Sequence, residues 1–191
     1  TTIGGVHAYV YTPKGGVEAK NRNRVMIALP SRSFSNCWPG CTELESLPIA
    51  ALGRIEVVGL DYRQGPKFRH PAASEDVAAA YRELLKTYRA ESIGIYGCSA
   101  GGMLTAMSVA WFQQHDLPRP GAIGILCAGA ASVGGSAFGG DASFTAMPLG
   151  ESRVVAPGAP VGMDYFAGTD PKDPLVAPAS SPAVLAKFPP T

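Results

Sequence analysis

One serine lies between two glycines directly after an apolar run, in the segment Gly97-Cys98-Ser99-Ala100-Gly101. Glycines two residues before and after a serine allow a strand and a helix to pack closely around a sharp turn. Such a turn exposes the Ser99 hydroxyl beside a helix N-terminus, where the Ala100 N–H would stabilise an oxyanion. The segment therefore predicts a serine nucleophile for acyl transfer. The alternative is a glycine-rich turn that binds a phosphate or only packs.

A serine nucleophile needs a general base, and histidine is the usual one. His115 is the only histidine after Ser99. If one helix connects them, His115 lies about 24 Å away, so we expect it on the surface near the helix C-terminus. His70 is expected to pack, and His7 lies in the N-terminal arm. Ser99 is therefore left without a base. The carboxylates later in the chain have no base to orient, and they are Asp141, Asp164, Asp170 and Asp173.

Four short apolar runs are predicted to be the strands that position Ser99. They cover residues 25–29, 55–60, 92–96 and 122–127. Their apolar character is continuous rather than alternating, which is typical of parallel strands buried on both faces. Strands and helices alternate with short connections, which predicts parallel strands joined by right-handed crossovers. The pattern predicts an α/β fold with a doubly wound, mainly parallel sheet and helices on both faces.

Helical spacing of apolar residues predicts the elements between these strands. One helix is expected from Ser74, a candidate N-cap, to about Arg89, and a second over residues 101–115. Residues 128–160 are rich in glycine, alanine, serine and proline, and an irregular excursion is expected there. Short helical pieces are expected at 161–167 and 181–187.

The composition describes a single globular domain with no polyanion-binding character. The chain has 191 residues, of which 46% are hydrophobic and 16% charged, with a net charge of +1. Without a basic cluster, nucleic acid is not an expected partner. No signal peptide is predicted, because the N-terminus lacks a basic region and a long apolar core. No membrane span is predicted, because the charge-free stretch at 121–140 is rich in glycine. A cytoplasmic location is expected.

The four cysteines lack the spacing of a zinc site, and no metal site is predicted. Free thiols are the favoured interpretation, with a local bridge between Cys37 and Cys41 left open. Redox or thiol chemistry at Cys98 is set aside because the sequence shows no electropositive partner for it.

Together with the serine turn, three further segments resemble one branch of the α/β-hydrolases. This is the hormone-sensitive-lipase branch, whose bacterial members are esterases. The turn itself, with Gly102, looks like the family's GDSAGG nucleophile elbow. Residues 61–76 are similar to the family's DYRLAP and PAALED run, and residues 170–178 are similar to its DPRDPLVSP segment. Residues 29–34 are similar to its LHGGGF loop. The resemblance covers essentially the whole chain. It implies a carboxylic ester hydrolase that acts on short- or medium-chain acyl esters through a Ser99 acyl-enzyme, with no cofactor.

The chain departs from this family at the glycine loop, where it reads Pro30-Ser31-Arg32-Ser33. By resemblance, Arg32 and Ser33 occupy oxyanion-donor positions, together with Ala100 after the serine. Side chains there would restrict the backbone, so impaired turnover is expected. Arg32 could instead pair with a carboxylate, which leaves a non-catalytic ligand-binding protein or a degenerate relative as the alternative.

The resemblance also implies that residues 1–191 are a single-domain fragment. The family's N-terminal lid helices would precede this chain, and its catalytic acid and histidine would follow Thr191. We therefore expect the acid and base from a further segment or a second chain. The other expected partner is a small-molecule ester, and a homodimer is left open.

Overall fold

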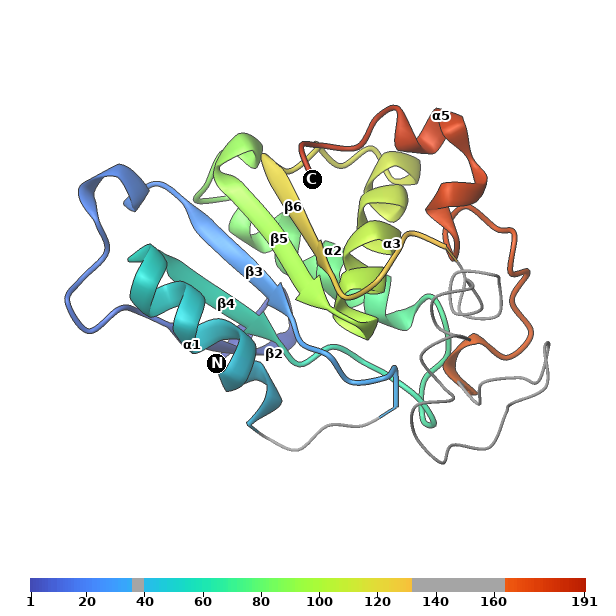
Figure 1. The fold of residues 1–191 in the computed structure, drawn as a ribbon, viewed down its shortest axis with the longest axis horizontal. Helices are drawn as coiled ribbons and strands as arrows, with labels where there is room; N and C mark the ends of the chain where they lie inside the picture. Colours follow the sequence, from blue (N-terminus) through green and yellow to red (C-terminus); the bar gives the residue numbers. More distant parts are fainter. Residues whose placement is uncertain (36–39, 132–163) are drawn as a thin grey trace, which may run out of the picture.

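The structure is a computed structural model that describes residues 1–35, 40–131 and 164–191. These residues contain a six-stranded sheet of order β1-β2-β4-β3-β5-β6 (Figure 1). β3 pairs with both β4 and β5 in parallel, and β6 adds in parallel to β5, whereas β2 pairs antiparallel with β4. The predicted α/β fold with a mainly parallel sheet is therefore confirmed. The strands are β1 (Thr2–Ile3), β2 (Val6–Tyr11), β3 (Val25–Leu29), β4 (Glu56–Leu60), β5 (Ile93–Cys98) and β6 (Ala122–Leu126).

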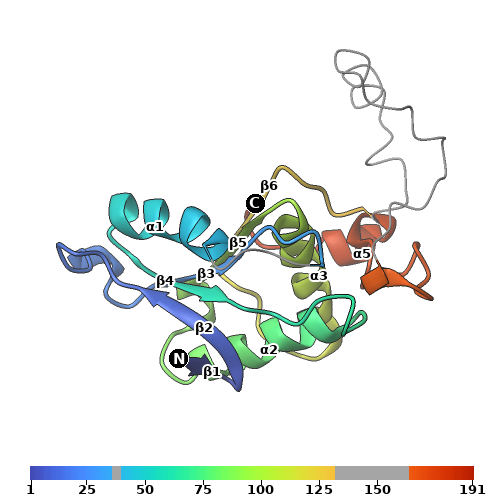
Figure 2. The same cartoon turned by 90° about the horizontal axis from the view of Figure 1, so that it is seen from below.

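Helices cover both faces of this sheet, as predicted. Figure 2 shows α1 (Cys41–Gly53) on one face and α2 (Ala72–Leu84) with α3 (Ala100–Gln114) on the other. α3 follows β5 directly and packs beside α2. The carboxyl ends of β3, β4 and β5 consequently lie at one edge of the sheet, where the loops that follow them meet.

Several predicted boundaries were wrong. α2 begins at Ala72 with Pro71 at the N-cap, so Ser74 lies inside the helix, where its buried Oγ has no hydrogen-bond partner. The helix ends at Leu84 rather than near Arg89. Proline marks the true start because it fits the first turn of a helix without losing an intrahelical bond.

The N-terminal hairpin and α1 were not predicted. The first half of β2 alternates in burial, since Val6 and Ala8 are buried whereas His7 is exposed. α1 carries exposed apolar residues and an internal proline, Pro48, so it lacks a clear amphipathic pattern. Tertiary packing on the sheet therefore decides this helix, rather than its own periodicity.

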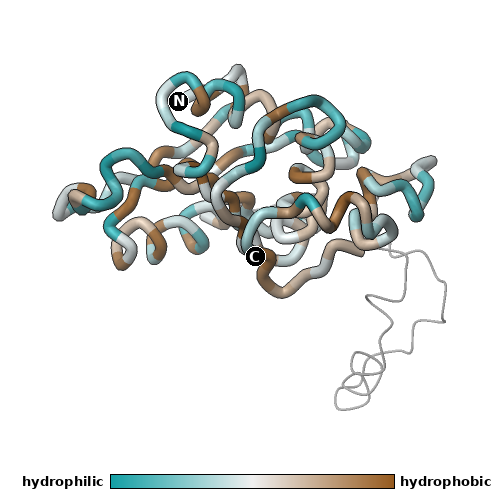
Figure 3. Tube along the Cα trace, turned by 90° about the horizontal axis from the view of Figure 1, so that it is seen from above, coloured by the Kyte–Doolittle hydropathy of each residue, from teal (hydrophilic) through white to brown (hydrophobic). Residues whose placement is uncertain are grey.

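The core lies between the sheet and the α2–α3 layer. Its largest fully buried side chains include Tyr62, Tyr81, Phe112, Ile27 and Leu104. The rings of Tyr81 on α2 and Phe112 on α3 stack with centroids 4.5 Å apart. In Figure 3 the central strands are largely brown and the peripheral loops largely teal, so the sheet is the apolar centre of the domain.

The C-terminal residues return to the outer edge of the sheet. The Ile123 N–H of β6 donates to the Pro190 carbonyl at 2.9 Å, so the chain end lies beside β6 (Figure 1). Of the two predicted helical pieces, the second is α5 (Pro182–Leu185). The first is a 3-10 turn at Asp164–Phe166, with its earlier part outside the described residues. The expected excursion at 128–160 lies mostly outside them.

Candidate active site

Ser99 occupies the turn between β5 and α3. Its backbone has φ 51° and ψ −119°, a combination that L-residues rarely adopt. Such strain costs about 1–3 kcal/mol and persists only where the surrounding structure enforces it. Two backbone hydrogen bonds enforce it here: the Ser99 N–H donates to the Leu126 carbonyl at 2.8 Å, and the Met103 N–H donates to the Ser99 carbonyl at 3.0 Å.

The glycines around Ser99 have no room for a side chain. A Cβ on Gly101 would lie 1.7 Å from the Leu29 carbonyl oxygen, and a Cβ on Gly97 would lie 2.4 Å from the same atom. Both clashes are with backbone, which cannot move aside as a flexible side chain would. The predicted close packing of strand and helix around the serine is therefore confirmed.

The oxyanion candidates lie around this turn. Ala100 is the first residue of α3, so its N–H has no acceptor within the helix and points out of the helix N-terminus. The loop that contains Arg32 and Ser33 begins beside the turn, because Leu29 pairs with Gly97 and its carbonyl touches Gly101. Their role as oxyanion donors stays a prediction.

The loop at 30–35 adopts left-handed backbone without glycine. Ser33 has φ 50° and Phe34 has φ 49°. Tertiary contacts hold it in place: the Tyr62 hydroxyl donates to the Pro30 carbonyl at 2.7 Å, and the buried Phe34 ring stacks on Tyr165 with centroids 5.0 Å apart. Contacts with Tyr62 and Tyr165 thus stabilise a left-handed backbone that glycine would adopt more readily.

Arg32 directs its guanidinium into the protein. The side chain is 9% exposed, forms an ion pair with Asp61, and donates to the Thr42 hydroxyl at 3.1 Å. It also lies over the Tyr62 ring, with the guanidinium carbon 5.7 Å from the centroid. The guanidinium is therefore neutralised by this chain's own Asp61, which leaves little positive charge for a bound carboxylate.

Glu45 is a site residue that the sequence analysis missed. It belongs to α1, and its Oε1 accepts the Ser31 N–H at 2.8 Å, while its buried Oε2 has no partner. Burial raises the pKa of this carboxyl above its usual range, although the hydrogen bond from the Ser31 N–H opposes the shift. Glu45 thus ties α1 to the loop after β3 through the Ser31 N–H. Only a prediction of α1 could have indicated it.

Among the described residues, none of the three histidines hydrogen-bonds Ser99. His115 follows α3 and bonds the Trp111 carbonyl at 2.8 Å, as expected for the far end of the helix. His70 packs against Phe166, as predicted, and burial lowers the pKa of its ring. His7 pairs with the Asp61 carboxylate at 3.2 Å, so it extends the Arg32 ion pair.

Two of the later carboxylates, Asp170 and Asp173, stabilise turns. Asp170 accepts the Lys172 N–H at 2.8 Å, and Asp173 accepts the Leu175 N–H at the same distance. Asp164 begins the 3-10 turn, and Asp141 lies outside the described residues. Within residues 1–35, 40–131 and 164–191, no cluster of three potential metal ligands occurs, and no helix combines the length and apolar character needed to cross a bilayer.

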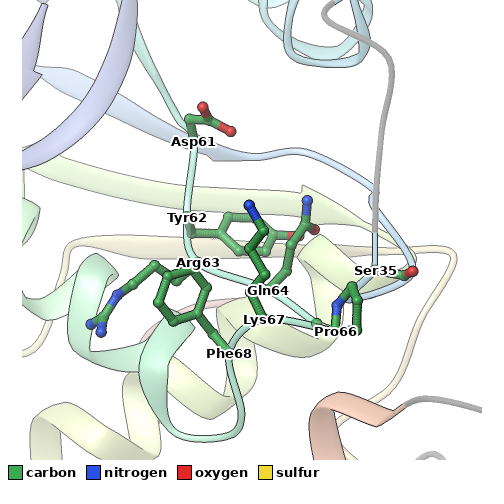
Figure 4. Close-up of a pocket in the computed structure, with 9 residues that line it drawn as sticks. Ser35, Asp61, Tyr62, Arg63, Gln64, Pro66, Lys67 and Phe68 are labelled. Carbon is green, nitrogen blue, oxygen red and sulfur yellow. The ribbon is translucent and has the colours of Figure 1, made fainter.

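An open cavity of about 550 Å³ lies at the carboxyl end of β4 (Figure 4). Residues 61–68 and Ser35 line it. Arg63 lies along one wall with its guanidinium 5.6 Å from the Phe68 ring centroid, and it is held there by Asp76 at 2.8 Å. Ser99 does not line this cavity. The cavity therefore occupies the same edge of the sheet as the elbow without containing the predicted nucleophile.

The cysteines differ from the expectation in one case. Cys41 is disulfide-bonded, so the prediction of a free thiol was wrong for this residue. Cys98 and Cys127 are free, as predicted. Cys37 lies outside the described residues.

Comparisons with known proteins agree with this geometry. The profile of a family described as "alpha/beta hydrolase fold" matches residues 45–191. An acetyl-hydrolase from Streptomyces hygroscopicus is 29% identical over 164 residues, which cover 84% of this chain and 53% of that protein. A kynurenine formamidase from Meyerozyma guilliermondii is 42% identical over 50 residues, which cover 26% of this chain and 19% of that protein.

Solved structures extend the likeness to nearly the whole chain. An esterase from the bacterial hormone-sensitive lipase family is 26% identical with a TM-score of 0.70 and covers 93% of this chain. An esterase/lipase from an uncultured bacterium is 24% identical with a TM-score of 0.77 and covers 99% of it. The chain spans 58% and 60% of those two proteins. The predicted resemblance to this branch of hydrolases is confirmed.

Proposed function

The chain belongs to the α/β-hydrolase fold family, and from that premise we propose that it carries the nucleophile of a serine carboxylic ester hydrolase. The observation that supports this most is the Ser99 backbone, at φ 51° and ψ −119° between β5 and α3. A strained turn that projects a hydroxyl beside a helix N-terminus has a clear use in nucleophilic catalysis. Packing alone would not require a serine there.

In the proposed reaction, Ser99 Oγ attacks the carbonyl carbon of a short- or medium-chain acyl ester. The Ala100 N–H donates to the developing oxyanion, and backbone N–H groups at Arg32 and Ser33 are the further candidates. The alcohol leaves with a proton, and water then releases the acid from the acyl-enzyme. The acetyl-hydrolase relative supports a small acyl group, by its name.

The proposed reaction also needs a base that accepts the Ser99 proton. The three histidines of the chain lie elsewhere: His7 pairs with Asp61, His70 stacks on Phe166, and His115 bonds the Trp111 carbonyl. We expect the base, with its orienting acid, on a further segment or a second chain, because the relatives are longer than this chain. The cytoplasmic location also remains a proposal.

The main alternative is binding of a small carboxylate by Arg32 without turnover. The ion pair with Asp61 and the hydrogen bond to Thr42 argue against it, since they already engage both terminal nitrogens of the guanidinium. A bound carboxylate would have to displace Asp61 from a side chain that is only 9% exposed. Ester hydrolysis is therefore the better-supported function.

A fluorophosphonate probe tests the proposal on the protein in its natural full-length form. We expect one covalent adduct, located on Ser99 by peptide mapping and absent from Ser99→Ala. Ser35→Ala is the matched control, because Ser35 is an exposed serine of the neighbouring loop and should leave labelling unchanged. Labelling should be accompanied by hydrolysis of p-nitrophenyl butyrate. A folded protein that neither labels nor hydrolyses this ester would overturn the proposal.

A further inference from the structure

Two free thiols follow neighbouring strands at the nucleophile turn. Cys98 is the last residue of β5 and directly precedes Ser99, whereas Cys127 directly follows β6. The two strands pair in parallel, with Cys98 opposite Leu126. The thiols are therefore one register step apart on adjacent strands, although 29 positions separate them in sequence.

The backbone brings the two side chains together. In a regular parallel ladder, Cys127 would point to the opposite sheet face from Cys98, because successive side chains alternate. Cys127 instead has φ 51°, a left-handed conformation that ends the strand and changes the direction of its side chain. The two thiols lie close enough to influence each other, because Cys127 contributes to the raised pKa of Cys98. Adjacent strands are about 4.8 Å apart, and a disulfide needs Cα atoms about 4.4–6.8 Å apart, so the backbone spacing suits a bond.

The two thiols differ in access and in readiness to react. Cys127 is exposed to solvent, whereas Cys98 is only partly exposed. Burial, together with the neighbouring Cys127 thiol, raises the pKa of Cys98 and keeps it protonated. Because the thiolate is the nucleophile in thiol–disulfide exchange, Cys127 should react first and Cys98 second.

We propose that Cys98 and Cys127 are a reactive thiol pair that closes to an intramolecular disulfide on reaction with a small-molecule disulfide. In the first step, the Cys127 thiolate attacks the reagent and forms a mixed disulfide, releasing one thiol. In the second step, the Cys98 sulfur attacks the Cys127 sulfur, gives up its proton and displaces the second thiol. The protein loses two hydrogen atoms, and the reagent gains them as it is reduced to two thiols.

This bond would join the residue before Ser99 to the end of β6. The Ser99 N–H already donates to the Leu126 carbonyl, so the disulfide would reinforce an existing link on the same two strands. The sequence does not indicate the pair, because the partner of Cys98 becomes visible only when β5 and β6 are aligned. The inference does not depend on the proposed ester hydrolysis, since it concerns the thiols alone.

The test is incubation of the full-length protein with oxidised glutathione, followed by intact mass spectrometry without reductant. We expect the mass to fall by about 2 Da with no glutathione retained. Peptide mapping should find Cys98 joined to Cys127, with the Cys41 bridge unchanged. A wild-type protein that stably retains glutathione on Cys127, or that joins either thiol to Cys41, would overturn the proposal.

Single-cysteine variants test the order of steps. Cys98→Ser should retain one glutathione on Cys127, because the resolving thiol is gone. Cys127→Ser should react at least about tenfold more slowly, because only the partly exposed, protonated Cys98 remains. If Cys98→Ser does not fold, Cys98→Ala serves instead, and the wild-type peptide map remains decisive. Equal rates of reaction for the two variants would contradict the proposed order.

Discussion

The turn at Ser99 and the loop at 30–35 lie side by side but are held by different forces. Around Ser99, two glycines meet backbone atoms at distances that admit no side chain. In the loop, Ser33 and Phe34 adopt left-handed backbone without glycine. Backbone packing thus determines the turn, whereas side-chain contacts determine the loop.

Those loop contacts come from elements distant in sequence. Tyr62 binds the Pro30 carbonyl, Glu45 accepts the Ser31 N–H, and Asp61 pairs with Arg32. Each can be removed singly while the others remain. We therefore expect that one added methyl group at a glycine of the turn prevents it from forming. Removal of one side-chain contact should lower the stability of the loop only in part.

Gly101→Ala should have the largest effect. The new methyl group would lie 1.7 Å from the Leu29 carbonyl oxygen, so β3 and α3 would have to separate. We expect a loss of at least about 4 kcal/mol in the free energy of unfolding, measured by urea denaturation, or failure to fold. Gly15→Ala is the control, because a Cβ there meets no atom within 4 Å. Equal stability of the two variants would refute steric control of the turn.

Arg32→Ala should have an intermediate effect. It removes a buried guanidinium from Asp61, Thr42 and Tyr62, leaving the Asp61 carboxylate with His7 as its remaining partner. The expected loss is about 2–3 kcal/mol in the free energy of unfolding, less than for a fully buried pair because Asp61 is partly exposed. Lys86→Ala, which breaks the exposed pair with Glu83, should cost less than about 0.5 kcal/mol. A similarly small cost for Arg32→Ala would mean that the loop does not depend on this pair.

Ser33→Gly should have the smallest effect, with the opposite sign. Glycine relieves the cost of φ 50° but adds freedom to the unfolded chain, so we expect a net gain of about 0.5–1 kcal/mol in stability. Thermal denaturation measures it. Ser35→Gly, at a residue of the same loop without positive φ, should instead lose about 0.5–1 kcal/mol. A loss for Ser33→Gly would show that its side chain, rather than its backbone, fits the site.

Much of the central fold could be predicted because its signals are local. The run Val25–Leu29 is a strand with the predicted bounds, and the helix expected at 101–115 is α3 at Ala100–Gln114. The bounds of α2 failed because Ser74 resembles an N-cap although Pro71 holds that position. α1 was missed because its outer face carries Leu44 and Leu52, which are exposed.

The sequence by itself determined the turn at Ser99, because the two glycines, the apolar strand before them and the helix after them are adjacent in the chain. Only the tertiary structure decided the surroundings of the turn. It turned Arg32 toward Asp61, placed Glu45 against the Ser31 N–H, and brought Cys127 to Cys98. These contacts join residues 14 to 29 positions apart, and their geometry depends on strand register and helix placement, which local sequence patterns do not specify.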